Sequence, residues 1–91
     1  MIHAVVLIEA ERAAIANLGG ALTDVDGVAE AYSVTGEWDF VAMLRVRKLE
    51  DVHRVVTHDF AEIPGITRTN TMVAFEAFSQ HDLEALFSIG N

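Results

Sequence analysis

A short polar turn, Gly36-Glu37-Trp38-Asp39, joins three residue types that can take part in ligand binding. Glycine allows a close approach of the backbone to a ligand and leaves N–H groups accessible. The indole of Trp38 offers an apolar wall, and the carboxylate of Asp39 could accept the ammonium group of a small molecule. Each residue also has a structural interpretation: the glycine makes the turn, the tryptophan packs in an interface, and the aspartate bonds nearby N–H groups.

A second polar segment, residues 67–71, alternates Thr67, Thr69 and Thr71 with Arg68 and Asn70. Threonine hydroxyls on one strand face could bind a polar ligand, although the β-propensity of threonine explains the same pattern without a ligand.

The histidines do not suggest a metal site or a catalytic group. His53 and His58 are five residues apart on an expected helix, whereas a shared metal requires a spacing of about four. No nucleophile, base and orienting group can be assembled from the spacing, so we predict no catalytic residue, metal or cofactor. The absence of cysteine excludes disulfides and cysteine-ligated metal centres.

The composition indicates one small domain that associates with other subunits. The chain has 91 residues, and its hydrophobic fraction of 52% exceeds what so small a core can readily cover. The net charge of −8 argues against binding to nucleic acid or anionic lipid. Arg45, Arg47 and Lys48 form one basic cluster, which we interpret as a solvated strand end. Residues 1–8 lack the basic start of a signal peptide, so we expect a cytoplasmic location.

The hydrophobic periodicity predicts two βαβ halves with a helical extension. Strands are expected at residues 2–9, 28–35, 40–46 and 66–78, and helices at residues 11–22 and 49–63. The order gives an α+β, ferredoxin-like βαββαβ sandwich over residues 1–78. Residues 79–91 begin with the capping-box-like Ser79-Gln80-His81-Asp82 and are expected to form a short C-terminal helix.

The first and third strands have apolar residues on both faces. Val5 and Leu7 join His3 on one face of the first strand, and Val41 and Met43 lie on the corresponding face of the third. Two helices can cover only one face of the sheet, so we expect a homodimer that packs its other faces together.

The chain resembles the effector-binding domain of the Lrp/AsnC (feast/famine) regulators, also called the RAM domain. The matching features are the hairpin sequence of residues 28–40, then Ile63-Pro64-Gly65-Ile66, then Thr69-Asn70-Thr71 on the last strand. The similarity extends to about Phe78. Position 38 is commonly a tyrosine in the family, which could change the size or polarity of the pocket.

The resemblance implies a dimeric sandwich that often assembles into rings, such as octamers or decamers, and binds an amino acid or similar small effector at subunit junctions. Carried over by position, the expected effector-binding residues are those of the hairpin and the last strand: Thr35, Gly36, Trp38, Asp39, Thr69 and Thr71. Family regulators carry an N-terminal helix-turn-helix domain, and this chain begins at the first strand. We therefore expect no direct contact with nucleic acid and a possible co-assembly with full-length regulators.

Two other functions are compatible with the sequence. One is a small dimeric α+β-barrel enzyme of the cofactor-free monooxygenase or isomerase type, with His3 and Tyr32 in a cavity between sheet and helices. The other is a purely structural oligomerisation unit whose function is its apolar sheet face.

Overall fold

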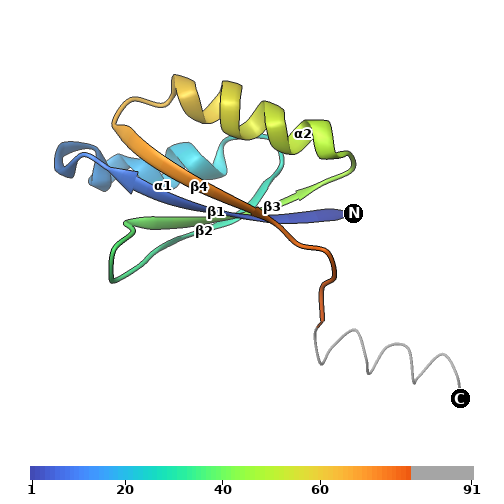
Figure 1. The fold of residues 1–91 in the computed structure, drawn as a ribbon. Coiled ribbons are helices and arrows are strands. Elements are labelled where there is room, and N and C mark those ends of the chain that lie inside the picture. Colours follow the sequence, from blue (N-terminus) through green and yellow to red (C-terminus); the bar gives the residue numbers. More distant parts are fainter. Residues whose placement is uncertain (79–91) are drawn as a thin grey trace, which may run out of the picture.

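The computed structural model describes residues 1–78, which form an antiparallel sheet of four strands with helices on one side (Figure 1). The strands are β1 (Ile2–Ala10), β2 (Val28–Ser33), β3 (Phe40–Val46) and β4 (Ile66–Val73). The helices are α1 (Ile15–Thr23), which a 3-10 turn at Arg12–Ala14 precedes, and α2 (Leu49–Arg54). The sheet order β2-β3-β1-β4 confirms the predicted ferredoxin-like topology.

The core lies between the sheet and the helices. Alternate residues of the two central strands are buried, among them Val6 and Ile8 of β1 and Ala42 and Leu44 of β3. The helices contribute further buried side chains, namely Leu18, Leu22, Val52, Val55 and Phe60. Burial of one such large apolar side chain stabilises the fold by about 1.5–3 kcal/mol.

The opposite face of the sheet, which we call the open face, has no covering layer in the single chain. Figure 1 shows both helices on the other side of the sheet. Val5 pairs with Met43 and Leu7 with Val41, and all four side chains are half-buried. Tyr32 of β2 and Met72 of β4 are each 48% exposed. The predicted apolar character of both sheet faces is therefore confirmed.

The last strand is shorter than predicted. β4 ends at Val73 rather than at Phe78, and the N–H of Ala74 makes a last hydrogen bond of 2.9 Å to the carbonyl of His3. This bond lies near the start of β1, where only Ile2 of that strand remains beyond His3. Residues 74–78 leave the sheet on the side away from the helices (Figure 1), and the predicted helix within residues 79–91 lies outside the described residues.

The second helical segment changes its hydrogen-bonding pattern along its length. After α2 the backbone forms a π-helix at Val55–Asp59 and a 3-10 turn at Phe60–Glu62, where one regular helix over residues 49–63 was expected. A π turn brings residues five apart onto one side. Arg54 and Asp59 have this spacing, and their side chains form an ion pair of 2.5 Å. Within residues 1–78, no helix combines the length and apolarity needed to cross a bilayer.

Candidate functional site

The loop of the β2–β3 hairpin has an open tip. The N–H of Val34 bonds the carbonyl of Asp39 at 3.1 Å, which closes the loop. Gly36 has a φ of +106°, a conformation that other residues rarely adopt. A Cβ at Gly36 would meet no heavy atom within 4 Å, and Thr35 beside it is exposed. The glycine is thus required by the turn, and space remains around it.

Asp39 connects the loop to β1 through two hydrogen bonds. Its N–H bonds the carbonyl of Ile8 at 2.9 Å, and its Oδ2 accepts the N–H of Ala10 at 2.8 Å. The register between β1 and β4 shifts between Glu9 and Ala10, so the pairing of β4 is irregular where Asp39 bonds the N–H of Ala10. The structural interpretation of Asp39 is therefore correct in kind, although the donor belongs to β1 rather than to the turn. Among the described residues, Oδ1 of Asp39 makes no hydrogen bond.

Arg68 connects the same loop to β4. Its Cζ lies 4.2 Å from the centroid of the Trp38 ring, which is the geometry of a cation–π contact. Its Nη2 lies 3.2 Å from a carboxylate oxygen of Glu37 and 3.3 Å from one of Glu9. The hydrogen bond to Glu37 is the main cause that raises the pKa of Arg68 above its usual value. Arg68 was not among the predicted site residues.

Thr69 and Thr71 lie on the other side of the sheet from this cluster. They pair with Ile8 and Val6, whose side chains are in the core, whereas Arg68 pairs with Glu9 on the open face. Thr69 lines a hollow of about 220 Å³ beside the C-terminal end of the second helical segment. Its other lining residues are Val56, Phe60, Ala61, Ile63, Ile66, Thr67 and Arg68.

One chain therefore brings together only part of the predicted site. Trp38 and Asp39 lie with Arg68 and two glutamates at one end of the sheet, and Thr35 and Gly36 form the adjoining tip. Thr69 and Thr71 do not face this cluster. The cluster presents a guanidinium group, an indole and carboxylates within one small surface.

His3 and Tyr32 do not form a catalytic pair in the single chain. Both belong to the open face, because His3 pairs with Arg45 and Tyr32 with Val41. Positions 41 and 45 of β3 are separated by roughly 13 Å along a strand. Tyr32 donates a hydrogen bond to Glu30, which raises the pKa of the phenol. The predicted position of both residues between sheet and helices is wrong.

Sequence comparison gives a family and a curated relative. The profile of the family described as the Lrp/AsnC ligand binding domain matches residues 3–83. An uncharacterized HTH-type transcriptional regulator of Pyrococcus abyssi is 34% identical over 59 residues, which are 65% of this chain and 39% of the relative. The chain thus spans about two fifths of the length of that relative.

Solved structures give the same picture at the level of the whole fold. TTHA0845 from Thermus thermophilus superposes with a TM-score of 0.82 at 40% identity, covering 88% of this chain and 100% of that protein. FFRP-DM1 gives a TM-score of 0.77 at 28% identity, and the alignment covers 82% of this chain and 100% of that protein. The Neisseria meningitidis transcriptional regulator NMB0573, solved as a complex with L-Met, gives a TM-score of 0.77 at 11% identity and covers 87% of this chain and 53% of that protein. This is a similarity of fold alone.

Proposed function

The chain belongs to the Lrp/AsnC ligand-binding domain family, and we propose that it is an effector-binding and oligomerisation domain whose ligand is an amino acid or a similar small molecule. The observation that supports this ligand class is the pair of charged groups beside Trp38. The Arg68 guanidinium lies over its ring, and the Asp39 carboxylate follows it in the chain. An amino acid offers a carboxylate to the first, an ammonium group to the second and a side chain to the indole.

The proposed site comprises the residues expected from the sequence, with Arg68 added. Thr35, Gly36, Trp38 and Asp39 come from one hairpin. Thr69 and Thr71 face the other side of their own sheet, so in this proposal they reach the same ligand only from a neighbouring subunit. The separation supports a ligand that binds at a subunit junction.

The open face is the proposed dimer interface. Val5, Leu7, Val41 and Met43 form its centre, and the exposed Met72 lies beside Val5. A second copy that packs its own open face here would bury this apolar surface at about 25 cal/mol per Å². Further assembly of such dimers into an octameric or decameric ring belongs to the same proposal.

The mass of the particle in solution tests the dimer. The Leu7→Glu substitution puts a charge into the centre of the open face and should give a monomer by light scattering. Asn17→Glu is the matched control, because Asn17 is exposed on the helical side and its substitution should leave the mass unchanged. A Leu7→Glu protein with the mass of the unsubstituted protein would remove the open face from the proposal.

We propose that the partner in the cell is a regulator of the same family, which the kinship with HTH-type transcriptional regulators supports. The domain would act in the cytoplasm by co-assembly with such a regulator, without contacting nucleic acid itself. Co-purification of a tagged copy with a helix-turn-helix protein of this family tests that step.

Ligand binding is tested through Trp38, the one tryptophan of the chain. The twenty amino acids, beginning with L-methionine, are titrated while the Trp38 emission and the unfolding temperature are recorded. A ligand at 100 times its dissociation constant adds about 2.7 kcal/mol if it binds only the folded state. We expect one amino acid or a small class of them to change both signals. No response from any amino acid would favour another ligand class or the structural oligomerisation unit.

The enzyme interpretation gains no support, because His3 and Tyr32 are separated and lie on the open face. Turnover of an activated phenol or lactone by the purified protein would instead support the enzyme interpretation.

A further inference from the structure

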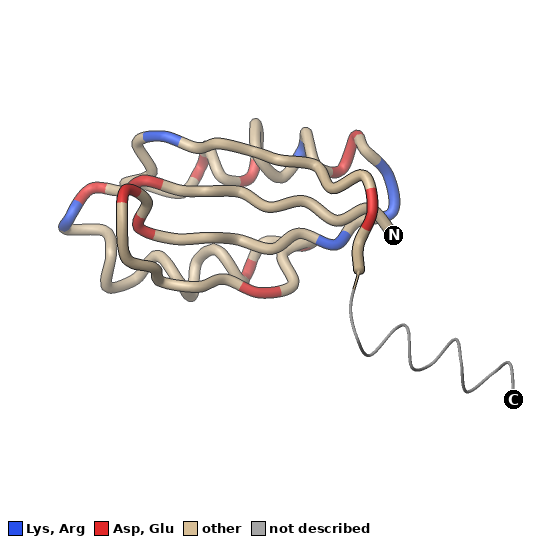
Figure 2. The backbone as a smooth tube through the Cα atoms, turned by 60° about the horizontal axis from the view of Figure 1, so that its bottom comes forward, with Lys and Arg blue, Asp and Glu red and all other residues tan. Residues whose placement is uncertain are grey.

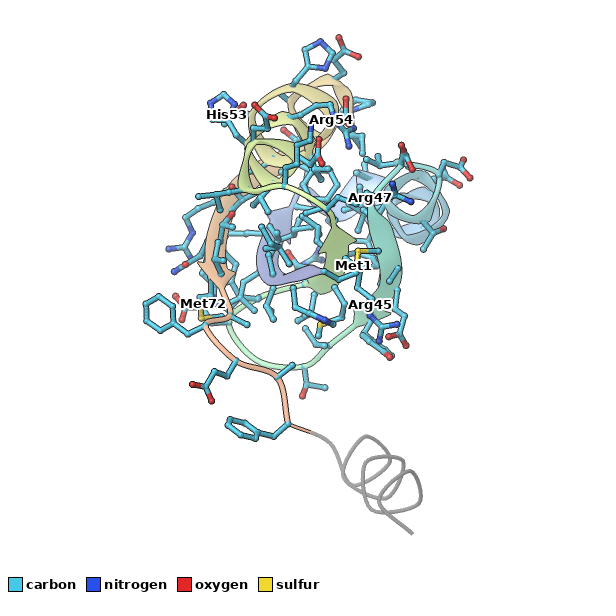
Figure 3. The ribbon with its side chains drawn as sticks, turned by 90° about the vertical axis from the view of Figure 1, so that its right-hand side faces the viewer. Met1, Arg45, Arg47, His53, Arg54 and Met72 are labelled. Carbon is cyan, nitrogen blue, oxygen red and sulfur yellow. The ribbon has the colours of Figure 1, made fainter. Side chains whose placement is uncertain are left out.

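A second hollow lies at the far end of the sheet from the hairpin loop. It has a volume of about 360 Å³ and is formed where the end of β3 meets the turn before β2 and the start of α2. Its charged lining residues are Arg45, Arg47, Arg54, Asp26 and Asp51. Figure 3 looks onto this end and shows Arg54 beside α2, Arg45 on the side of Met1 away from the helices, and Arg47 between them. We call this feature the cationic hollow.

The basic residues of the chain are concentrated here. Four of the six Lys and Arg residues fall within residues 45–54, in a chain whose net charge is −8. Figure 2 shows these blue segments toward the end of the molecule that carries the N-terminus. Among the described residues, neither Arg45 nor Arg47 forms an ion pair with a carboxylate. The guanidinium groups of Arg45, at the border of the open face, and of Arg47, at the end of β3, therefore keep their hydrogen-bond donors available.

Arg54 is held in place by neighbours on two sides. Its Nη1 pairs with the carboxylate of Asp59, and its Nη2 lies 3.3 Å from the carbonyl of Asp26. The next carbonyl, that of Gly27, accepts the backbone N–H of Arg45 at 2.9 Å. One turn thus positions the side chain of Arg54 and the backbone of Arg45. A guanidinium group has five N–H donors, so these contacts leave others for a ligand.

Gly27 keeps this turn close to the two neighbouring elements. A Cβ at Gly27 would lie 2.9 Å from Cγ1 of Val46 and 3.7 Å from Nη2 of Arg54. Its φ of +103° is also one that other residues rarely adopt. The wall of the hollow therefore depends on a residue without a side chain.

We propose that the cationic hollow binds a small oxyanion, the phosphate or carboxylate group of a metabolite-sized molecule. The guanidinium fork matches the geometry of both groups. The volume lies within the range of about 300–1,000 Å³ that is usual for small-molecule sites. Asp26 and Asp51 line the same hollow, so a molecule with one anionic group and a hydroxyl donor fits better than a polyanion. The site is independent of the effector site, because β3 has seven residues and separates the two by roughly 20 Å.

Glycerol 3-phosphate and lactate are suitable probes, since each joins one oxyanion group to a hydroxyl group. Each is titrated by calorimetry at low ionic strength, with sodium chloride at matched ionic strength as the blank. We expect saturable binding of at least one probe and no change in Trp38 emission. Binding of glycerol 3-phosphate alone assigns a phosphate ligand, and binding of lactate alone assigns a carboxylate ligand; both support the site.

Matched charge removals separate a site from general attraction. Arg47→Gln should weaken binding at least tenfold, and because Arg47 makes no ion pair within residues 1–78, the fold should be unaffected. Arg45→Gln should act in the same direction. Arg12→Gln removes the same charge from an exposed arginine of the 3-10 turn outside the lining and should change affinity less than twofold.

Three results would overturn the proposal. One is the absence of saturation by either probe up to about 10 mM. Another is an equal loss of affinity in Arg12→Gln and Arg47→Gln, which would mean unspecific attraction. The third is tight binding of a short DNA duplex that Arg47→Gln abolishes while both small probes fail, which would assign the surface to nucleic acid.

Discussion

Oδ2 of Asp39 accepts a hydrogen bond of 2.8 Å from the backbone N–H of Ala10, twenty-nine residues earlier in the chain. The Asp39 carboxylate therefore has two possible roles. It joins the hairpin loop to β1, and its other oxygen is available to a ligand. A substitution that removes both the hydrogen bond and the charge cannot distinguish these roles. Two replacements that differ in what they keep are therefore needed.

Asparagine and alanine at position 39 should separate fold from binding. Asp39→Ala leaves the partly buried N–H of Ala10 without its acceptor, and we expect a loss of about 1–3 kcal/mol in the free energy of unfolding. Asp39→Asn keeps an acceptor oxygen and should lose less than about 1 kcal/mol. Urea denaturation measures both values.

The same pair of variants tests the effector site. Asp39→Asn removes the negative charge that would receive an ammonium group, so it should lose the amino-acid response of Trp38 while remaining folded. An unchanged response in a folded Asp39→Asn protein would remove Asp39 from the proposed site. A loss below about 0.5 kcal/mol in Asp39→Ala would show that the hydrogen bond to Ala10 contributes little.

Arg68→Gln should change the environment of Trp38 more than the stability of the fold. Arg68 is 49% exposed and its pairs with Glu9 and Glu37 are partly solvated, so we expect less than about 1 kcal/mol of destabilisation. Removal of the guanidinium group uncovers the indole, and the Trp38 emission should shift to longer wavelength with stronger quenching by acrylamide. Arg12→Gln is the control for charge alone. An unshifted emission would show that the stacked contact is not maintained in solution.

The fold could be predicted from the sequence because its causes are local. The apolar residues on both faces of residues 2–9 and 40–46 indicated two central strands. In the structure these segments pair with each other in the middle of the sheet. The length of β4 could not be predicted in this way. Its apolar residues continue to Phe78, but pairing stops at Ala74, where only Ile2 of β1 remains beyond His3.

The site was harder to predict because its contacts depend on register. Residues 9 and 68 are distant in sequence, and only the pairing of β1 with β4 places Arg68 beside Glu9 and over Trp38. No sequence signal marked Arg68. The resemblance named Thr69 and Thr71, yet their parity puts them on the opposite side from Trp38. The side of the sheet that each threonine faces depends on the pairing register of β4, which the sequence alone does not give.

Three glycines with positive φ should respond differently to alanine. At Gly65 a Cβ would lie 2.3 Å from Cβ of Ala14, and at Gly27 it would lie 2.9 Å from Val46 Cγ1, whereas Gly36 has open space. Conformational strain alone costs about 1–2 kcal/mol, so Gly36→Ala should lose about that much. Overpacking adds about 1–3 kcal/mol, so Gly27→Ala and especially Gly65→Ala should lose more.

A double substitution checks the cause at Gly65. Ala14→Gly removes the atom that the new Cβ would meet, so Gly65→Ala should cost less in that background than in the unsubstituted chain. Equal costs in both backgrounds would show that the backbone conformation, and not the contact with Ala14, determines the loss. Chemical denaturation of the four proteins gives the comparison.

His58 should titrate above its usual value. A hydrogen bond with Asp59, and next the charge of Glu62, raise the pKa of His58, and the same hydrogen bond is the main cause that lowers the pKa of Asp59. The folded state therefore favours the charged imidazole. Its stabilising contribution is fully present below the unfolded pKa of about 6.5 and is lost as the pH rises through the raised folded pKa.

NMR titration of the His58 ring protons, with Glu62→Gln as the first variant, measures this shift. Glu62 lies 3.7 Å from Nε2 of His58, so removal of its charge should lower the His58 pKa part of the way toward the usual value. Asp59→Asn should lower it further, but it also breaks the ion pair with Arg54 and will reduce stability wherever Asp59 is ionised. Glu62→Gln leaves that pair intact and is therefore the cleaner test. A His58 pKa at or below about 6.5 in the unsubstituted protein would mean that the contact with Asp59 is not populated in solution.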